Sequence, residues 1–199
     1  MKTNWYRFIW VALCGFLGVI CPVDKTTIGG DATAEFRVAG YLPDYRVAQF
    51  DLQASAGLTD LILFSAEPTA AGGLDLGRLK NVPWVKFREF KTKHRVRLIL
   101  CVGGWERSAQ FAAVARTPEN RRPFAKAAVR VCLDERLDGI DIDWEHPQNA
   151  AEQENYGQLL TELRTVFQPH GLVLSVTVAA WQKLPAETFK AVDWIQVMA

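Results

Sequence analysis

Four acidic residues lie within the eight positions from Asp138 to Glu145, in a run that is otherwise apolar. Alternate residues of a β-strand point to the same face, so Asp141, Asp143 and Glu145 would share one face at about 6–7 Å per step of two residues. Burying like charges side by side is costly and forces at least one pKa upward. A carboxylic acid that stays protonated near neutral pH is the proton donor that glycoside and acyl chemistry need. The spacing therefore indicates acid catalysis.

Other interpretations of these acids stay open at this point. Asp138-Gly139 is also typical of a turn. Three carboxylates on one face could instead bind a divalent cation, which takes carboxylate oxygens as ligands. The strand could also be a solvent-exposed edge, but Ile140 and Ile142 argue against that because they form a separate apolar face that must pack on something.

The segments around the acids alternate between strand patterns and helical patterns. The expected strands are 36–41, 59–64, 95–102, 137–144, 172–179 and 192–198. The expected helices are 45–57, 76–93 with a break near Pro83, 118–137, 150–167 and 185–189. This alternation predicts an α/β fold with a parallel sheet, in which active groups lie at the C-terminal ends of the strands. The residues that fall there are Tyr41, Phe64, Gly103, Gly104, Trp105, Glu145, Trp181 and Met198.

The number of strands leaves two architectures open. A closed (β/α)8 TIM barrel needs about 250 residues and eight strand–helix units, whereas residues 36–199 supply about six such units. The sheet is therefore either an open sheet of six strands or the first part of a TIM barrel. The open sheet would leave two edges that need covering.

Composition limits the classes of partner. The chain has 199 residues, of which 49% are hydrophobic and 23% are charged, as in an ordinary globular domain. Its net charge of +1 gives no electrostatic reason to expect nucleic acid or an anionic membrane as a partner. Cys101 falls near a strand end and Cys132 late in the following helix, so we expect two free thiols too far apart to bridge.

The N-terminus has the pattern of a secretion signal. Lys2 and Arg7 precede an apolar run from Phe8 to Cys21, which is short for a membrane span of about 20 residues. We interpret residues 1–22 as a signal peptide or N-terminal anchor and residues 23–35 as a linker. The protein is then secreted, periplasmic or extracellular, and it meets a membrane only if the N-terminal segment stays uncleaved.

Several motifs resemble those of one enzyme family. The string from Asp138 to Glu145 resembles the complete DxxDxDxE signature of family 18 glycoside hydrolases, the chitinases and their relatives. The stretch from Cys101 to Trp105 resembles the family's SxGG motif, with Cys where Ser is usual. Residues 194–199 are similar to the start of its sixth-strand motif. The resemblance covers residues 36–199 and implies a partial catalytic barrel of this family.

The resemblance implies a role for each acid. Glu145 would be the general acid. Asp143 would orient the N-acetyl group of the substrate, whose carbonyl oxygen attacks the anomeric carbon in place of an enzyme nucleophile. Asp141 would share a proton or a hydrogen bond with Asp143. His146, which follows Glu145, is assigned to the loop rather than to proton transfer. The family needs no metal and no organic cofactor.

The expected substrate-binding residues are Tyr41, Phe64, Gly104, Trp105 and Met198. Aromatic side chains suit a sugar site because the apolar faces of pyranose rings stack on them. The alternative for each aromatic residue is core packing. The partner would be an N-acetylglucosamine-containing polysaccharide.

The expected function is hydrolysis of β-1,4 glycosidic bonds in chitin or related N-acetylglucosamine polymers by substrate-assisted retaining catalysis. The alternatives are an endo-β-N-acetylglucosaminidase acting on glycans or peptidoglycan, and a chitin-binding lectin-like module. Retention of the acid at Glu145 favours the enzyme. The family's next residues, a Tyr and an Asp, would follow Ala199. We therefore expect weak or absent activity from the chain as written.

Overall fold

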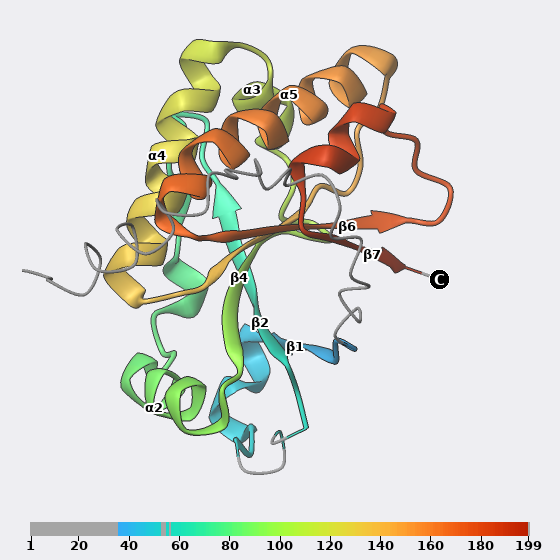
Figure 1. The fold of residues 1–199 in the computed structure, drawn as a ribbon. Coiled ribbons are helices and arrows are strands. Elements are labelled where there is room, and N and C mark those ends of the chain that lie inside the picture. Colours follow the sequence, from blue (N-terminus) through green and yellow to red (C-terminus); the bar gives the residue numbers. More distant parts are fainter. Residues whose placement is uncertain (1–35, 53–54, 56, 199) are drawn as a thin grey trace, which may run out of the picture. The chain divides into compact units, whose positions relative to one another are not determined.

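The computed structural model describes residues 36–52, 55 and 57–198, so the expected signal peptide and linker lie outside the described residues. In the described part of the chain, six parallel strands lie side by side in chain order (Figure 1). They are β1 (Ala39–Pro43), β2 (Asp60–Pro68), β4 (Arg97–Gly103), β5 (Gly139–Asp143), β6 (Val173–Ala179) and β7 (Trp194–Met198). The short strand β3 (Leu74–Asp75) pairs antiparallel with β2.

Helices connect these strands and pack on the outside of the sheet. The α-helices are α2 (Trp84–His94), α3 (Phe111–Ala115), α4 (Pro118–Glu135) and α5 (Ala150–Phe167). The shorter 3-10 helices are η1 (Asp44–Gln49), η3 (Gly77–Leu79), η4 (Gln168–His170) and η5 (Ala186–Ala191). Helices α3, α4 and α5 contact one another on one side of the sheet (Figure 1).

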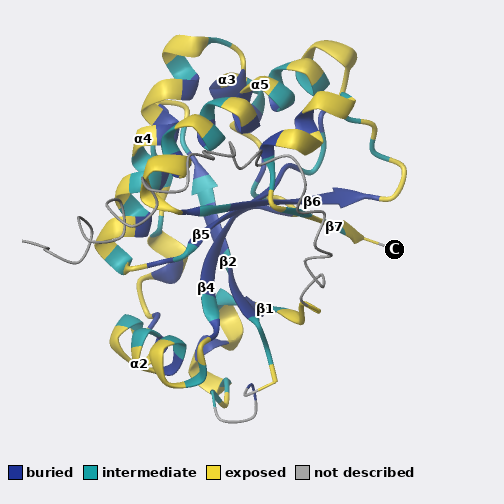
Figure 2. Ribbon diagram, viewed as in Figure 1, coloured by how far each residue is buried: buried dark blue, intermediate teal, exposed yellow. Residues whose placement is uncertain are grey.

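The two faces of the sheet bury different side chains. Leu100, Ile140 and Val176 face the helices and belong to the main hydrophobic core, as the alternation along a strand requires. On the opposite face a small separate cluster is formed by Ile62, Ile99 and Cys101. Figure 2 shows the central strands buried, whereas β1 and β7 at the two ends of the strand order and the outer surfaces of the helices are more exposed.

The sheet is curled rather than open and flat. Strands β1 and β7 stand at opposite ends of the strand order. Nevertheless Tyr41 of β1 and Gln196 of β7 both form a hydrogen bond with Asp141 of β5. Two opposite edges reach one central side chain only if the sheet bends around it. The fold is therefore the first part of a (β/α)8 TIM barrel, and the open-sheet alternative is wrong.

Most expected elements are confirmed, with shifts at their ends. Helix α5 has the predicted bounds because Asn149 caps it, its side chain accepting a hydrogen bond from the Glu152 N–H (2.9 Å). The first strand begins at Ala39 rather than at residue 36, since its pairing with β2 starts there. The helix expected at 45–57 is the short η1, and the strand β3 and helix α3 were not predicted.

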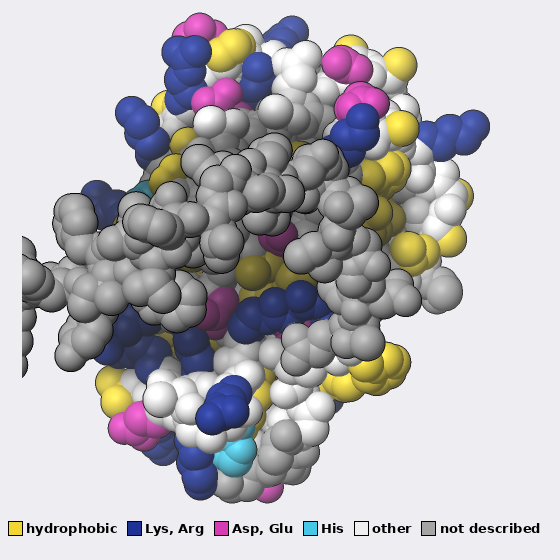
Figure 3. Space-filling model, viewed as in Figure 1, with side chains coloured by type: hydrophobic (Ala, Val, Ile, Leu, Met, Phe, Trp, Pro, Cys, Tyr) yellow, Lys and Arg dark blue, Asp and Glu magenta, His cyan; other side chains and the backbone are white. Residues whose placement is uncertain are grey.

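Three further properties concern the described residues. Cys101 and Cys132 are buried free thiols, as expected. None of the helices in the described part of the chain combines the length and apolar content that crossing a bilayer needs. Acidic and basic side chains are interspersed over the described part of the surface in Figure 3.

Candidate active site

The acid strand β5 sends its carboxyl groups to the concave side of the curled sheet. Ile140 and Ile142 point to the helices, and Asp141 and Asp143 alternate with them. All four residues are buried. The predicted separation of an apolar face from an acidic face is confirmed, and the edge-strand alternative is wrong because β4 and β6 flank β5 on both sides.

Asp141 is fully buried, and side chains from other strands donate hydrogen bonds to both of its oxygens. Ser175 Oγ (2.6 Å) and Gln196 Nε2 (3.0 Å) donate to Oδ1. Tyr41 Oη (2.8 Å) and Thr177 Oγ1 (2.9 Å) donate to Oδ2. Burial raises the pKa of Asp141, and these hydrogen bonds oppose the rise. Donors from β1, β6 and β7 thus fix the orientation of this carboxyl group.

Asp143 is only 4% exposed, and its Oδ1 has no hydrogen-bond partner among the described residues. Burial, followed by the charges of Glu145 and Asp141, raises the pKa of Asp143 to about 8. Its carboxyl group is therefore largely protonated at neutral pH.

The hydrogen bond of Asp143 differs from the expected one. Asp143 forms it with Glu145, whereas the sequence analysis expected a shared proton or hydrogen bond with Asp141. The reason is that side chains from other strands already occupy both oxygens of Asp141.

Glu145 lies just beyond the end of β5, with a side chain that is 12% exposed. Its backbone N–H donates to Ser108 Oγ (3.0 Å). The Ser108 hydroxyl lies within 3.0 Å of the Gly104 carbonyl and 3.1 Å of the Asp143 carbonyl. The loop after β4 therefore holds the start of the loop after β5. On the other side of Glu145, His146 Nε2 lies 3.6 Å from Oε2.

Gly103 and Gly104 form the tight junction between β4 and its loop. Both have left-handed backbone angles, with φ of +99° and +94°. A Cβ at Gly103 would collide with the Asp143 carbonyl, and a Cβ at Gly104 would collide with the Phe64 ring. Only glycine fits these positions. The two glycines therefore allow a tight turn and a close approach of backbone beside the acids.

The predicted aromatic residues surround the acids to different degrees. Tyr41 packs edge-on against Phe64, with ring centroids 6.5 Å apart. Phe64 also packs against the small inner cluster, so it is partly a core residue. Trp105 is 69% exposed, which rules out core packing for it. Met198 lies in β7, two residues after the Asp141 partner Gln196, and is 36% exposed.

Sequence reasoning missed the polar residues that hold Asp141. Ser175 and Thr177 alternate with apolar residues in β6, and Gln196 has the same pattern in β7. This alternation was the available signal, because it places polar side chains on the face that the acids occupy.

Arg107 was also missed. Its Nη1 donates to Ser65 Oγ and its Nη2 to Asp44 Oδ1, both at 3.1 Å. The guanidinium lies 4.8 Å from the centre of the Phe64 ring. Arg107 and Asp44 are about 10% exposed. This buried ion pair ties the loop after β4 to the segment after β1.

A cavity of about 350 Å³ adjoins the acid at the strand end. Its wall includes Glu106, Ser108, Trp144, Glu145, His146 and Glu152. Among residues 36–52, 55 and 57–198, no group of three or more His, Cys, Asp or Glu side chains is arranged to hold a metal ion.

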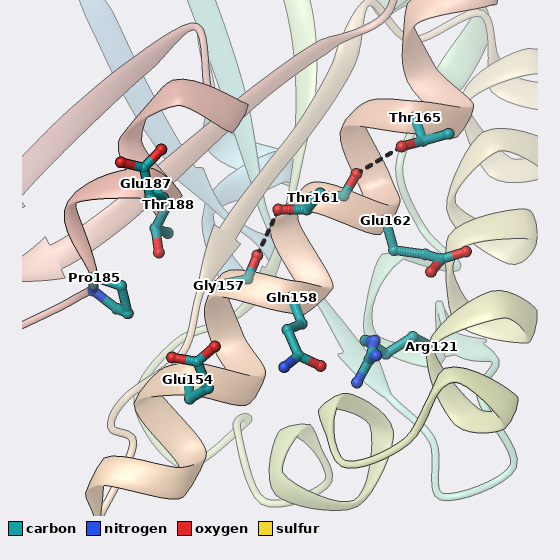
Figure 4. Close-up of a pocket in the computed structure, with 10 residues that line it drawn as sticks. All are labelled: Arg121, Glu154, Gly157, Gln158, Thr161, Glu162, Thr165, Pro185, Glu187 and Thr188. Atoms are coloured by element: carbon teal, nitrogen blue, oxygen red, sulfur yellow. Dashed lines mark hydrogen bonds between the residues drawn. The ribbon is translucent and has the colours of Figure 1, made fainter.

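A second hollow, of about 400 Å³, lies on the outer helical surface between α4, α5 and η5 (Figure 4). Two of its threonines, Thr161 and Thr165, donate to carbonyls of their own helix at 3.0 Å. It shares no lining residue with the cavity beside Glu145. We assign it no part in the acid site.

The curled sheet and the buried acids at its C-terminal end define an α/β-barrel protein with an acidic site at the strand ends. Residues 37–199 match Glycosyl hydrolases family 18, and the chain belongs to this family.

Among curated relatives, it is similar to Chitinase 1 of Aphanocladium album, with 34% identity over 122 residues, covering 55% of this chain and 29% of the relative. The chain thus spans less than a third of that relative's length.

Solved structures show the same fold. The group IV chitinase of Ostrinia furnacalis in complex with allosamidin superposes with a TM-score of 0.71 at 29% identity, covering 81% of this chain and 50% of that one. The family 18 N-acetylglucosaminidase of Paenibacillus barengoltzii gives a TM-score of 0.73 at 26% identity, covering 82% and 53%. This chain therefore corresponds to about half of each solved structure.

Proposed function

We propose that the protein hydrolyses β-1,4 glycosidic bonds in chitin or related N-acetylglucosamine polymers by substrate-assisted retaining catalysis. The observation that carries this proposal is the row of Asp141, Asp143 and Glu145, in which Asp141 and Asp143 are buried and the pKa of Asp143 is raised to about 8. Such a row supplies acids in different protonation states within one site. Membership of family 18 and the similarity to a chitinase support the same substrate class.

In the first step, Glu145 gives its proton to the glycosidic oxygen as the bond to the anomeric carbon breaks. The carbonyl oxygen of the substrate's own N-acetyl group forms the new bond to that carbon. In the second step, water attacks the anomeric carbon, the bond from that carbon to the N-acetyl oxygen breaks, and the water gives a proton to Glu145. The retained configuration follows from the two successive inversions.

We assign Asp143 the task of orienting the N-acetyl group. The unpartnered Oδ1 supports this assignment, since an N–H donor from the substrate would satisfy it. Asp141 would keep its carboxyl group in one position beside Asp143, because side chains from three other strands donate hydrogen bonds to it.

The sugar-binding surface would comprise Tyr41, Phe64, Gly104, Trp105 and Met198. The exposure of Trp105 supports a stacking role, since an exposed indole offers a flat apolar face to a pyranose ring. Gly104 allows the loop to pass close to Asp143 and Phe64.

We also propose that residues 1–22 act as a signal peptide or anchor, residues 23–35 as a linker and residues 36–199 as part of the catalytic barrel. The supporting pattern is a charged start followed by an apolar run. The protein would then be secreted. Mass spectrometry of the N-terminus of the mature protein tests this, and an intact N-terminus on protein released into the medium would contradict cleavage.

The direct test compares two fluorogenic substrates that differ only at carbon 2. The N,N′-diacetylchitobioside carries the acetamido group, and the matched cellobioside carries a hydroxyl. Substrate-assisted catalysis predicts release of the fluorophore from the first alone. Equal hydrolysis of both would contradict the mechanism.

The similarity to an N-acetylglucosaminidase keeps that activity as a second candidate. The lengths of the products from a chito-oligosaccharide separate the two. Internal cleavage supports a chitinase, and release of single N-acetylglucosamine units supports the second candidate.

A further inference from the structure

His146 lies between Glu145 and the loop that follows β6. Its Nε2 is 3.6 Å from Glu145 Oε2. Its Nδ1 is 3.3 Å from Gln182 Oε1, and its ring packs edge-on against Trp181 with centroids 4.6 Å apart. The side chain is 18% exposed. Contacts at both nitrogens and on the ring hold the imidazole in one orientation.

The amide of Gln182 determines which nitrogen of His146 carries a hydrogen. Gln182 Oε1 accepts a hydrogen bond from the Ala179 backbone N–H (3.4 Å), which identifies this atom as the carbonyl oxygen. An acceptor opposite Nδ1 requires an N–H there. The nitrogen that carries this hydrogen is therefore Nδ1, and Nε2 is the nitrogen that faces Glu145.

The charged groups around His146 are acidic. Glu145 faces Nε2, and Asp143 lies behind Glu145. Glu106 and Glu152 line the adjoining cavity with His146. Glu152 also accepts hydrogen bonds from the Gln148 N–H (2.8 Å) and Asn149 Nδ2 (3.0 Å). Among the described residues that line this cavity, none is Lys or Arg.

We propose that His146 is a positioning residue for Glu145, whose imidazolium stabilises the Glu145 carboxylate that remains once the proton has passed to the glycosidic oxygen. This inference rests on the proposed role of Glu145 as proton donor. His146 keeps its own proton throughout and exchanges none with the substrate. A positive charge beside a developing carboxylate strengthens the acid, so the protein would work best at mildly acidic pH, where imidazole is charged.

The first experiment does not depend on turnover. The chain has three histidines, and comparison with His146→Phe assigns the imidazole signals of His146 in an NMR pH titration. In Glu145→Gln we expect the titration midpoint of His146 to fall, because the facing carboxylate is lost. An unchanged midpoint would overturn the proposal, whether or not the protein hydrolyses the chitobioside.

The second experiment measures kcat against pH for the wild type, His146→Phe and His146→Gln. Loss of the imidazolium should lower kcat near pH 5.5 by about tenfold and move the alkaline limb to higher pH by about half a unit or more. Gln182→Leu, which keeps the imidazole but removes its anchor, should give a smaller change. His170→Gln, which removes an imidazole far along the chain, should change neither.

The outcomes are distinguishable. A uniform loss of rate in His146→Phe with an unmoved pH profile would indicate a packing role and would overturn the proposal. Absence of hydrolysis by the wild type would match the weak or absent activity expected of the chain as written, and the NMR titration would then decide the pairing of His146 with Glu145.

Discussion

Tyr41 Oη donates a hydrogen bond of 2.8 Å to Asp141 Oδ2, joining two residues that lie 100 positions apart in the chain. The same hydroxyl lies 2.6 Å from Thr177 Oγ1. Burial and the charge of Asp141 raise the pKa of Tyr41, so the phenol keeps its proton and remains a donor. This contact links the first strand to the acid strand across the concave face.

Tyr41→Phe should therefore destabilise the fold and reduce activity. The variant removes one donor to a buried carboxyl group, which costs about 1.5–3 kcal/mol in the free energy of unfolding. Urea denaturation measures the loss. Tyr45→Phe is the matched control because Tyr45 is 70% exposed. Equal stability of the two variants would show that the hydrogen bond contributes nothing.

Asp143 gives the stability a defined pH dependence. Its pKa is about 8 in the folded protein, against 3.8 for an ordinary aspartate. Below about pH 4 Asp143 is protonated in both the folded and the unfolded state. Its contribution to the free energy of unfolding is then fully present. Between about pH 4 and 8 only the folded state holds it, so the contribution falls as pH rises, by at most about 1.4 kcal/mol per unit.

Urea unfolding of the wild type and Asp143→Asn between pH 4 and pH 9 checks this. The asparagine does not titrate, so the stability of the wild type relative to the variant should decline steadily across the window. Parallel stability curves would mean that burial does not raise the pKa of Asp143.

Replacing Arg107 should destabilise the fold more than replacing Tyr41. Arg107→Met removes the partner of Asp44 and leaves that buried carboxylate without its ion pair, which costs about 3–5 kcal/mol. Arg130→Met is the control, because the pair of Arg130 with Asp134 is exposed and worth about 0.5 kcal/mol or less. The double variant Arg107→Met with Asp44→Asn should recover part of the loss. Denaturation midpoints that match the control would contradict a structural role for this ion pair.

The elements that sequence predicted well are those with strong local signals. Helix α5 has an apolar stripe of helical period and an Asn149 cap, so both ends were found. The acid strand was found because Asp and Ile alternate in it. By contrast, residues 45–57 have an ambiguous apolar pattern, and the 3-10 helix η1 forms at their start. Local pattern does not determine such a segment, because packing against the sheet overrides propensity.

The same limit applies to the site. The three acids were identifiable because they lie close together in sequence. Their partners were not, since Tyr41, Thr177 and Gln196 come from other strands and meet Asp141 only after the sheet curls. For the same reason, the sequence did not reveal that Asp143 forms its hydrogen bond with Glu145 rather than with Asp141.

The measurement that tests the central claim most directly is the turnover of fluorogenic N,N′-diacetylchitobioside by the wild type and by Glu145→Gln. Loss of the proton donor should lower kcat by about 10²–10⁴-fold without unfolding the protein, since the amide keeps the shape of the carboxyl group. Glu162→Gln, on the outer face of α5, is the control and should retain full activity. Equal turnover by the wild type and Glu145→Gln would contradict the proposed function.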